Sequence, residues 1–263
     1  MRPTEPQLRQ NLTRYGRRLW ERGWVANHDG NLSLRLPRGR VLCSPTGISK
    51  ADLSTEMALV VDGETGKKLS GELRPFSELN LHLAFYACRE DAQAVVHAHP
   101  PLATAYGAAG IELPHPFLPE AVVSLGASIP TVPLALPGQG AADAIAPYLP
   151  DHHALLIAGN GVLTCGADLE QAYLRMELVE HLCTVAHAAC ALGGVQKLSS
   201  ATIEALLAAH VKAGLAPRLR EVETKGRSQK LRTQSSEAQN SEAQSSEELQ
   251  NLVNQEIARV LGR

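Results

Sequence analysis

The stretch AVVHAHP, residues 94–100, decides the fold, because it joins a run of small and β-branched residues to two histidines. Small and β-branched side chains favour a buried strand. Alternate residues of a strand face the same side about 6.6 Å apart, so His97 and His99 can turn their rings toward one point. Imidazole nitrogen binds Zn²⁺ at about 2.0 Å, and the pair therefore suggests a metal site that needs further ligands. Buried, hydrogen-bonded histidines are the alternative.

Strands and helices alternate around this stretch. Short runs closed by turn residues predict strands in NLSLRLP, GRVLCSP, MALVVDG, ASIPTVPLAL and HALLIAGNGVLTCG. Apolar residues at helical spacing predict helices over 7–23, 75–90, 168–194 and 199–214, with Asp168 as the N-cap of the third. The sequence therefore predicts one α/β domain over residues 1–217, with a central, mostly antiparallel sheet flanked by helices.

Composition and charge narrow the class of protein. The 263 residues are 44% hydrophobic, enough for a full core, and a net charge of −2 offers no basic surface for nucleic acid. Five cysteines, an odd number without a CxxC pair, favour reduced thiols in a cytosol over disulfides. The first twenty residues contain no apolar signal core, and no apolar run approaches the ~20 residues of a membrane span. We therefore expect a cytoplasmic protein that binds neither nucleic acid nor membrane.

The composition changes after residue 217. Residues 224–248 nearly lack large apolar side chains and repeat a Ser-Glu-Ala-Gln unit, which predicts a flexible linker over 218–246. Residues 247–263 regain an apolar stripe at helical spacing, and a short amphipathic helix of this kind is stabilised by laying its stripe on a partner. A helix that docks on its own protein, or a chance pattern in a tail, is the alternative. The stripe consists of Leu249, Leu252, Val253, Ile257, Val260 and Leu261.

An acidic residue and two polar turns accompany the histidines. Glu78 begins the helix that leads into the histidine strand, so it can return to the same neighbourhood as a carboxylate ligand or general base. A carboxylate at a helix N-terminus is also explained by the helix dipole alone. The turns DGNLS (29–33) and SPTGIS (44–49) can form a nest of backbone N–H groups and polar side chains for phosphate, and each can equally be an ordinary turn.

Taken in order, the segments GNLS, SPTGI, RPFSELNLH, AVVHAHP and GNGVLTCGADLEQAYLRMELVEH resemble the class II aldolase and adducin family, over roughly residues 8–215. The resemblance implies an α/β sandwich, a homotetramer with active sites between neighbouring subunits, and a bound Zn²⁺ in the aldolase branch. By position, His97 and His99 match metal ligands, and Glu78 matches a catalytic acid/base that can also bind the metal. The residues that match the phosphate cradle of the family are Gly30, Asn31, Thr46, Gly47 and Ser77.

The sequence departs from the family pattern at three places. Asn160 stands where the family has its third metal histidine, and a neutral amide oxygen is a weaker donor to zinc than imidazole. Phe76 precedes Ser77 where the family offers a second serine, and no tyrosine occupies the loop position of a proton donor, for which Glu120 is the nearby candidate. The expected metal site is therefore Glu78, His97, His99 and Asn160, or a water in its place, around Zn²⁺ or another divalent transition metal.

The resemblance implies a metal-dependent aldolase in which Glu78 moves a proton. A sugar phosphate such as L-fuculose 1-phosphate would yield dihydroxyacetone phosphate and a short aldehyde such as lactaldehyde. Dehydratase, epimerase and decarboxylase activities on sugar phosphates or sugar acids also begin with an enediolate and stay open, as does a non-catalytic, adducin-like interaction protein. The linker and terminal helix resemble those of bacterial microcompartment cargo, so residues 247–263 are expected to act as an encapsulation peptide that binds shell or cargo proteins.

Overall fold

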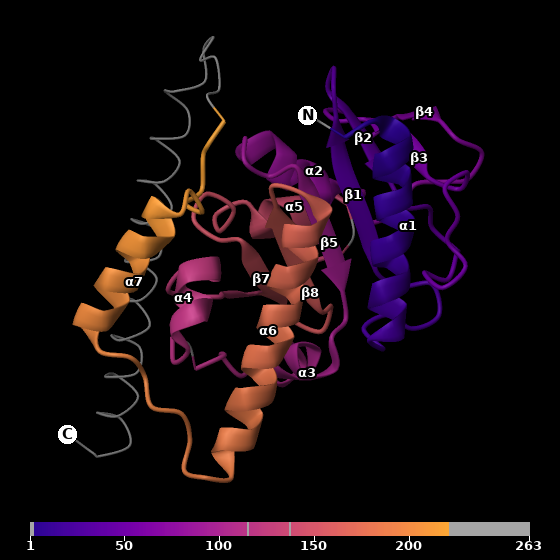
Figure 1. Cartoon of the computed structure of the whole chain (residues 1–263). Helices are drawn as coiled ribbons and strands as arrows, with labels where there is room; N and C mark the ends of the chain where they lie inside the picture. The colour runs from indigo at the N-terminus through magenta and orange to yellow at the C-terminus, as the bar shows by residue number, and fades with distance from the viewer. Residues whose placement is uncertain (1–2, 115, 137, 221–263) are drawn as a thin grey trace, which may run out of the picture. The chain divides into compact units, whose positions relative to one another are not determined.

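The computed structural model of the chain describes residues 3–114, 116–136 and 138–220 (Figure 1). The terminal helix expected over 247–263, and the expected linker from residue 221 onward, lie outside the described residues. Residues 218–220 are described, and Leu219 pairs with Arg89 in an isolated antiparallel bridge.

One eight-stranded sheet forms the centre of the domain, in the order β4-β3-β2-β1-β5-β8-β7-β6. All neighbouring strands are antiparallel except β6 and β7, so the expected, mostly antiparallel sheet is confirmed. The segment ASIPTVPLAL contributes only the two residues of β6, and HALLIAGNGVLTCG holds two strands joined by a turn. The strands are β1 (Asn31–Leu36), β2 (Arg40–Cys43), β3 (Leu59–Asp62), β4 (Lys68–Ser70), β5 (Ala94–Ala98), β6 (Thr131–Val132), β7 (Ala154–Ile157) and β8 (Val162–Gly166).

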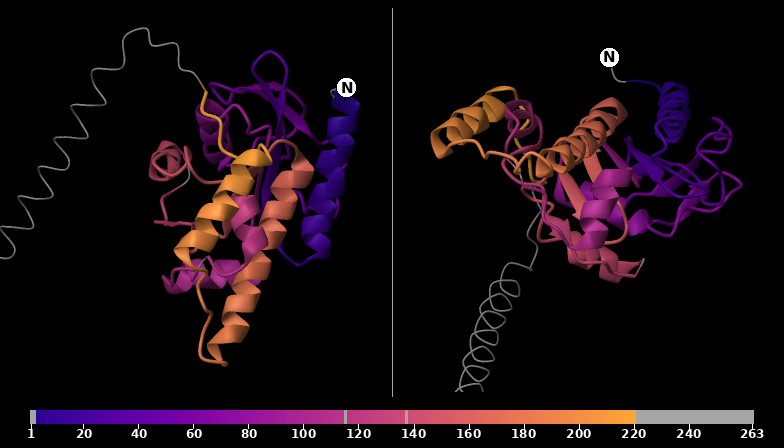
Figure 2. Two further views of the ribbon diagram at one scale, coloured as in Figure 1. Left: turned by 60° about the vertical axis from the view of Figure 1, so that its left-hand side comes forward. Right: turned by 90° about the horizontal axis from the view of Figure 1, so that it is seen from below.

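Helices cover both faces of the sheet, as the view from below in Figure 2 shows. Helices α1 (Glu5–Glu21), α3 (Pro101–Ala109), α4 (Pro119–Leu125) and α6 (Leu169–Cys190) contribute to the apolar core on one face. Helices α2 (Leu79–Cys88) and α5 (Gln139–Ile145) contribute to the core on the other, and α7 (Ser200–Lys212) packs against α4. The predicted N-cap of α6 is confirmed, because the Asp168 side chain accepts a hydrogen bond from the Gln171 backbone. Sequence periodicity did not predict α3, α4 and α5, which are short.

Strand alternation decides which side chains face α2. On β5, Ala94 and Val96 join the core beneath α1 and α6, whereas Val95 joins the core beneath α2. His97 shares the face of Val95 because it lies two residues further along the strand. The two-residue period of β1 likewise directs Asn31 and Ser33 toward α2, since Leu32 belongs to the opposite core. The two central strands therefore present polar side chains on the α2 side of the sheet.

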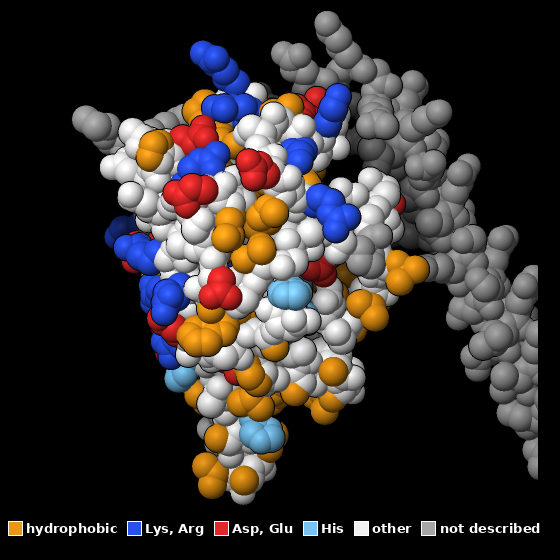
Figure 3. Space-filling model, turned by 90° about the vertical axis from the view of Figure 1, so that its right-hand side faces the viewer, with side chains coloured by type: hydrophobic (Ala, Val, Ile, Leu, Met, Phe, Trp, Pro, Cys, Tyr) orange, Lys and Arg blue, Asp and Glu red, His pale blue; other side chains and the backbone are white. Residues whose placement is uncertain are grey.

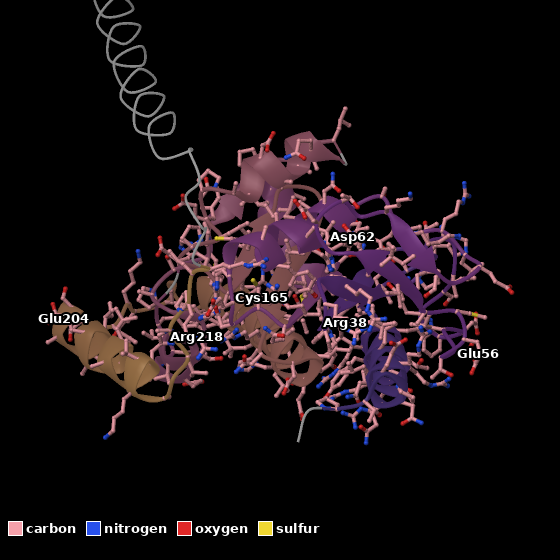
Figure 4. All side chains as sticks on the ribbon, turned by 90° about the horizontal axis from the view of Figure 1, so that it is seen from above. Arg38, Glu56, Asp62, Cys165, Glu204 and Arg218 are labelled. Carbon is pink, nitrogen blue, oxygen red and sulfur yellow. The ribbon has the colours of Figure 1, made fainter. Side chains whose placement is uncertain are left out.

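All five cysteines are free thiols, in line with the expectation of reduced cysteines. Figure 4 shows one of them, Cys165, near the middle of the molecule, whereas Glu56 and Glu204 lie toward opposite ends. Burial raises the pKa of the Cys165 thiol, so this side chain is a neutral core residue.

The surface carries mixed charges on the side that lies to the right in Figure 1 (Figure 3). Along α1, Arg9 pairs with Glu5 and Arg17 pairs with Glu21. Among the described helices, none combines the length and the apolar character that crossing a membrane would require.

Candidate active site

The two histidines lie where β5 ends. His97 belongs to the strand, whereas His99 follows it, and their Nε2 atoms are 3.2 Å apart. Tetrahedral ligands at about 2.0–2.1 Å from a zinc ion are about 3.3–3.4 Å from one another. The spacing of the two nitrogens is therefore that of two ligands of a single ion.

The other ring nitrogen of each imidazole lies against an oxygen, a backbone carbonyl for His97 and a carboxylate for His99. His97 Nδ1 lies 3.0 Å from the Val162 carbonyl oxygen, which can only accept, so the hydrogen is on Nδ1 and the lone pair is on Nε2. His99 Nδ1 lies 3.1 Å from Asp29 Oδ2. Metal-binding histidines typically use their second nitrogen in this way. Burial lowers the pKa of His97, which keeps the ring neutral and able to act as a ligand.

Glu78 precedes the first turn of α2, and its carboxylate faces the histidines. Its Oε1 accepts a 2.6 Å hydrogen bond from Asn160 Nδ2, and its Oε2 accepts one of 3.0 Å from Asn31 Nδ2. Oε2 also lies 3.4 Å from His97 Nε2. Burial alone would raise the pKa of Glu78, but the two amide hydrogen bonds favour the ionised carboxylate, and the pKa is lowered overall. The side chain makes no capping hydrogen bond to its helix, so the helix dipole alone does not explain its position.

Asn160 enters the site from the turn between β7 and β8. The amide group presents its nitrogen to Glu78, because an ionised carboxylate can only accept, so Asn160 acts here as a hydrogen-bond donor. The turn packs closely on the histidines through Gly161, which has a φ of +73°. A Cβ at this position would contact the Ala98 carbonyl oxygen and lie 2.5 Å from His99 Cδ2. Only glycine allows the turn to approach His99 this closely.

Three turns bring the predicted phosphate residues toward the same end of the sheet. Asn31 pairs with His97 in the β-ladder, and the preceding Gly30 is buried. The turn that carries Thr46 and Gly47 reaches the segment before Ser77 through a bridge between Pro45 and Pro75 and a 3.0 Å bond from Thr46 N to Arg74 O. Thr46, Gly47 and Ser77 are exposed, and the space beside Gly47 is open. Asn31 Oδ1 is buried without a hydrogen-bond partner among the described residues, which leaves an acceptor free for a ligand.

Glu120 lies apart from these residues within one chain. It occupies the first turn of α4 and is exposed, and that helix packs on α6 and α7. In the part of the chain that the structure describes, no hydrogen bond or ion pair joins Glu120 to Glu78 or the histidines. Its role as a proton donor stays a prediction.

Sequence reasoning missed two features of the site. One is Asp29, the carboxylate that orients His99, although it stands in the quoted turn DGNLS. The other is an apolar pocket wall beside Glu78 and Asn160, built from α2, α5 and the strand ends between them. Its lining side chains are Leu81, Pro133, Ala135, Ala141, Ala144, Ile145 and Ile157.

The side chains at this end of the sheet include donors for a divalent metal. Across residues 3–114, 116–136 and 138–220, no three His, Cys, Asp or Glu side chains already converge as a complete metal site. Glu78 uses one lone pair of each oxygen for an amide hydrogen bond, so its carboxylate can still bind an ion beside the two imidazole nitrogens. Two imidazoles at ligand spacing, with an ionised carboxylate beside them, fit a transition metal that keeps open positions for substrate.

Known proteins are similar to this chain in sequence and in fold. The chain is 35% identical over 181 residues to 3-oxo-tetronate 4-phosphate decarboxylase from Escherichia coli K12, covering 67% of this chain and 84% of that protein. It is 36% identical over 155 residues to L-fuculose phosphate aldolase from Haemophilus influenzae, covering 58% and 69%. The crystal structure of YgbL from Escherichia coli matches with a TM-score of 0.72 and 31% identity, covering 77% of this chain and 99% of that chain.

The family itself is shown by a match over most of the described domain. Residues 10–187 match the model described as the Class II Aldolase and Adducin N-terminal domain. The relatives named above are enzymes. The chain therefore belongs to the class II aldolase and adducin family.

Proposed function

We propose that the protein is a lyase that breaks the bond between the carbons α and β to the carbonyl of a short, phosphorylated keto compound. The observation that carries the proposal is the carboxylate of Glu78, which two amides hold 3.4 Å from the neutral imidazole of His97. A carboxylate fixed in this way can accept and return a proton at one position without reorganising. Glu78 is accordingly the acid/base of the reaction.

His97 and His99 would hold the divalent cation on which members of this family generally depend, and Zn²⁺ suits their nitrogen donors. When bound, the cation supplies Lewis-acid polarisation of a carbonyl oxygen. The chain keeps both rings oriented through the Val162 carbonyl and the Asp29 carboxylate. Asn160 contributes by holding Glu78 through its amide nitrogen. It would bind the metal as well only if its side chain turned its amide oxygen toward the ion.

The predicted phosphate cradle would anchor the other end of the substrate. Backbone N–H groups and hydroxyls at turns are suited to phosphate oxygens. Asn31 would serve both the reacting end of the substrate and its phosphate end. Its Nδ2 holds Glu78, and its Oδ1 is free to accept a hydrogen bond from a substrate hydroxyl. The remaining members of the cradle are Gly30, Thr46, Gly47 and Ser77.

Two substrates lead to the same enediolate. Aldol cleavage of L-fuculose 1-phosphate releases lactaldehyde and leaves the enediolate of dihydroxyacetone phosphate, and loss of CO₂ from 3-oxo-tetronate 4-phosphate leaves that enediolate too. Protonation of its terminal carbon yields dihydroxyacetone phosphate in both cases. In aldol cleavage Glu78 would return the proton that it takes from the hydroxyl of the cleaved carbon, and in decarboxylation it would first take a proton from water. The aldolase relative and the apolar wall beside Glu78, which suits an aldehyde with a methyl group, support the first substrate. The longer match to the decarboxylase supports the second.

A coupled assay separates these activities. The metal-loaded protein is given each substrate, and dihydroxyacetone phosphate is measured through NADH oxidation by glycerol-3-phosphate dehydrogenase. Lactaldehyde or CO₂ then identifies the bond that was broken, and Glu78→Gln should slow the reaction about 100-fold or more. Absence of dihydroxyacetone phosphate from both substrates refutes carbon–carbon cleavage. A dehydrated or epimerised product would instead indicate the related branches, and failure to acquire any metal would favour an adducin-like interaction protein.

We also propose a homotetramer and, for residues 247–263, binding to microcompartment shell or cargo proteins. Both proposals rest on the sequence. A flexible linker lets a terminal helix bind independently of the folded domain. Light scattering should give four times the 28.2 kDa mass of the chain. Diffuse fluorescence of a reporter fused to residues 247–263, in cells that produce shells, would contradict encapsulation.

A further inference from the structure

Lys50 is a buried cation at the end of the SPTGIS turn. Only 2% of its surface is exposed. Its Nζ donates to the backbone oxygens of Ile48, at 3.0 Å, and His28, at 3.4 Å. Among the described residues, the ammonium forms no ion pair, and its third N–H bond has no acceptor. A lysine is rarely buried without a charged partner, so this arrangement needs an explanation.

The two carbonyl contacts place Lys50 between the turns assigned to phosphate. Ile48 follows Thr46 and Gly47, whereas His28 lies two residues before Gly30. The ammonium therefore joins the two turns from their buried side. Their outer side is open, because Thr46 and Gly47 are exposed.

The phosphate cradle needs a positive charge that its own members do not supply. All five predicted residues are neutral, and Phe76 stands where a second hydroxyl would be. The chain as a whole is slightly acidic, with a net charge of −2, so its overall field does not attract a phosphate dianion. Lys50 is the ammonium that the fold places beside these turns.

We propose that Lys50 is the cationic element of the phosphate site, joining the two turns and stabilising the dianion bound on their outer side. This inference rests on the proposed function, which places a phosphorylated substrate at these turns. An ammonium removed from water interacts more strongly with a nearby anion than an exposed one does, because less solvent screens the pair. Lys50 thus selects phosphorylated substrates over their unphosphorylated analogues.

Substitution by methionine separates this role from a structural one. Lys50→Met keeps an unbranched side chain of similar length and removes the charge. Removing a buried ammonium without a charged partner recovers its desolvation cost, which offsets the loss of the two hydrogen bonds to backbone carbonyls, so folding should not suffer. A lysine that only braced the turns would show the opposite pattern, with lost stability.

The test measures binding of inorganic phosphate to the full-length protein by isothermal titration calorimetry. Lys50→Met should weaken binding at least tenfold while the Tm stays unchanged or rises. The control, Lys212→Met, removes an exposed lysine on α7 and should change neither quantity. Unchanged affinity in Lys50→Met, or weaker binding together with a lower Tm, overturns the proposal, as does a wild-type protein that binds no phosphate.

If Lys50→Met does not fold, phosphate binding by the wild-type protein as a function of pH tests the proposal instead. Burial lowers the pKa of Lys50 to about 8, although the negative charge of Asp29 opposes this shift. Further ionisable side chains on these segments are Arg17 of α1, which approaches the Ala51 carbonyl, His28, whose carbonyl Lys50 contacts, and Arg74, whose carbonyl accepts from Thr46 N. Phosphate affinity should fall as the pH rises from about 7.5 to about 9.5, because Lys50 loses its proton. A flat profile overturns the proposal. Phosphate binding without any dihydroxyacetone phosphate in the enzyme assay would refute the proposed reaction and leave this site standing.

Discussion

Asn160→Ala removes one of the two amide donors that hold Glu78. The lost bond, from Nδ2 to Oε1, is 2.6 Å long and has a charged acceptor. Hydrogen bonds to charged groups contribute about 1.5–3 kcal/mol, and one pKa unit corresponds to about 1.36 kcal/mol. Loss of this donor should therefore raise the pKa of Glu78 in this variant.

The sign of the pH effect follows from the lowered pKa of Glu78. Such a group stabilises the folded protein fully above its ordinary value of 4.5, and this stability is lost as the pH falls through the folded-state pKa. In Asn160→Ala the folded-state pKa rises, because burial of the carboxylate stays while a donor is gone. The stability that the carboxylate contributes at neutral pH should therefore be smaller in the variant, and its loss on acidification should end at a higher pH. The acid limb of kcat/KM should move to higher pH.

Two measurements check this prediction. Urea unfolding as a function of pH reports the stability, and the acid limb of the kcat/KM profile reports the ionisation that catalysis needs. Asn11→Ala is the matched control, because Asn11 lies on α1 and its side chain makes no hydrogen bond within the described residues. An acid limb that moves by less than about 0.3 units, in a folded variant that keeps its activity, would refute the assigned role of Asn160.

Three further predictions concern single features of the structure. Gly161→Ala should lower the free energy of unfolding by about 2 kcal/mol or more, since φ is +73° and the new Cβ would crowd His99. Urea denaturation measures this loss, and an unchanged midpoint would contradict it. Arg89→Met should destabilise the folded protein by about 3–5 kcal/mol, because it leaves the Asp91 carboxylate without its buried partner. A loss below about 1 kcal/mol in thermal unfolding would show that the pair is dispensable. Removal of divalent metal by a chelator should abolish turnover in the coupled assay. Added Zn²⁺ should restore turnover in the wild-type protein but not in a His97→Ala, His99→Ala double variant.

Local patterns in the sequence were enough to identify the principal side chains of the site. The period of two in AVVHAHP predicts that His97 and His99 turn toward one point, and their Nε2 atoms are 3.2 Å apart in the structure. Asp168 caps α6 as its residue type indicates. The order of the motifs, rather than any one of them, led to the family that the comparison shows. Properties of this kind depend on neighbours in the chain, so the sequence alone determines them.

The roles of Asn160, Asp29 and Lys50 depended on contacts that the sequence does not display. Glu78 and Asn160 are 82 residues apart, and the atom that Asn160 presents depends on an acceptor brought to it by another strand end. Lys50 is buried because two turns meet around it. Nothing in the polar sequence of these turns predicts that this lysine is buried. The sequence by itself determined which residues could do chemistry and on which face they lie. Only the tertiary structure decided their partners and burial, because these depend on how distant segments close around one another.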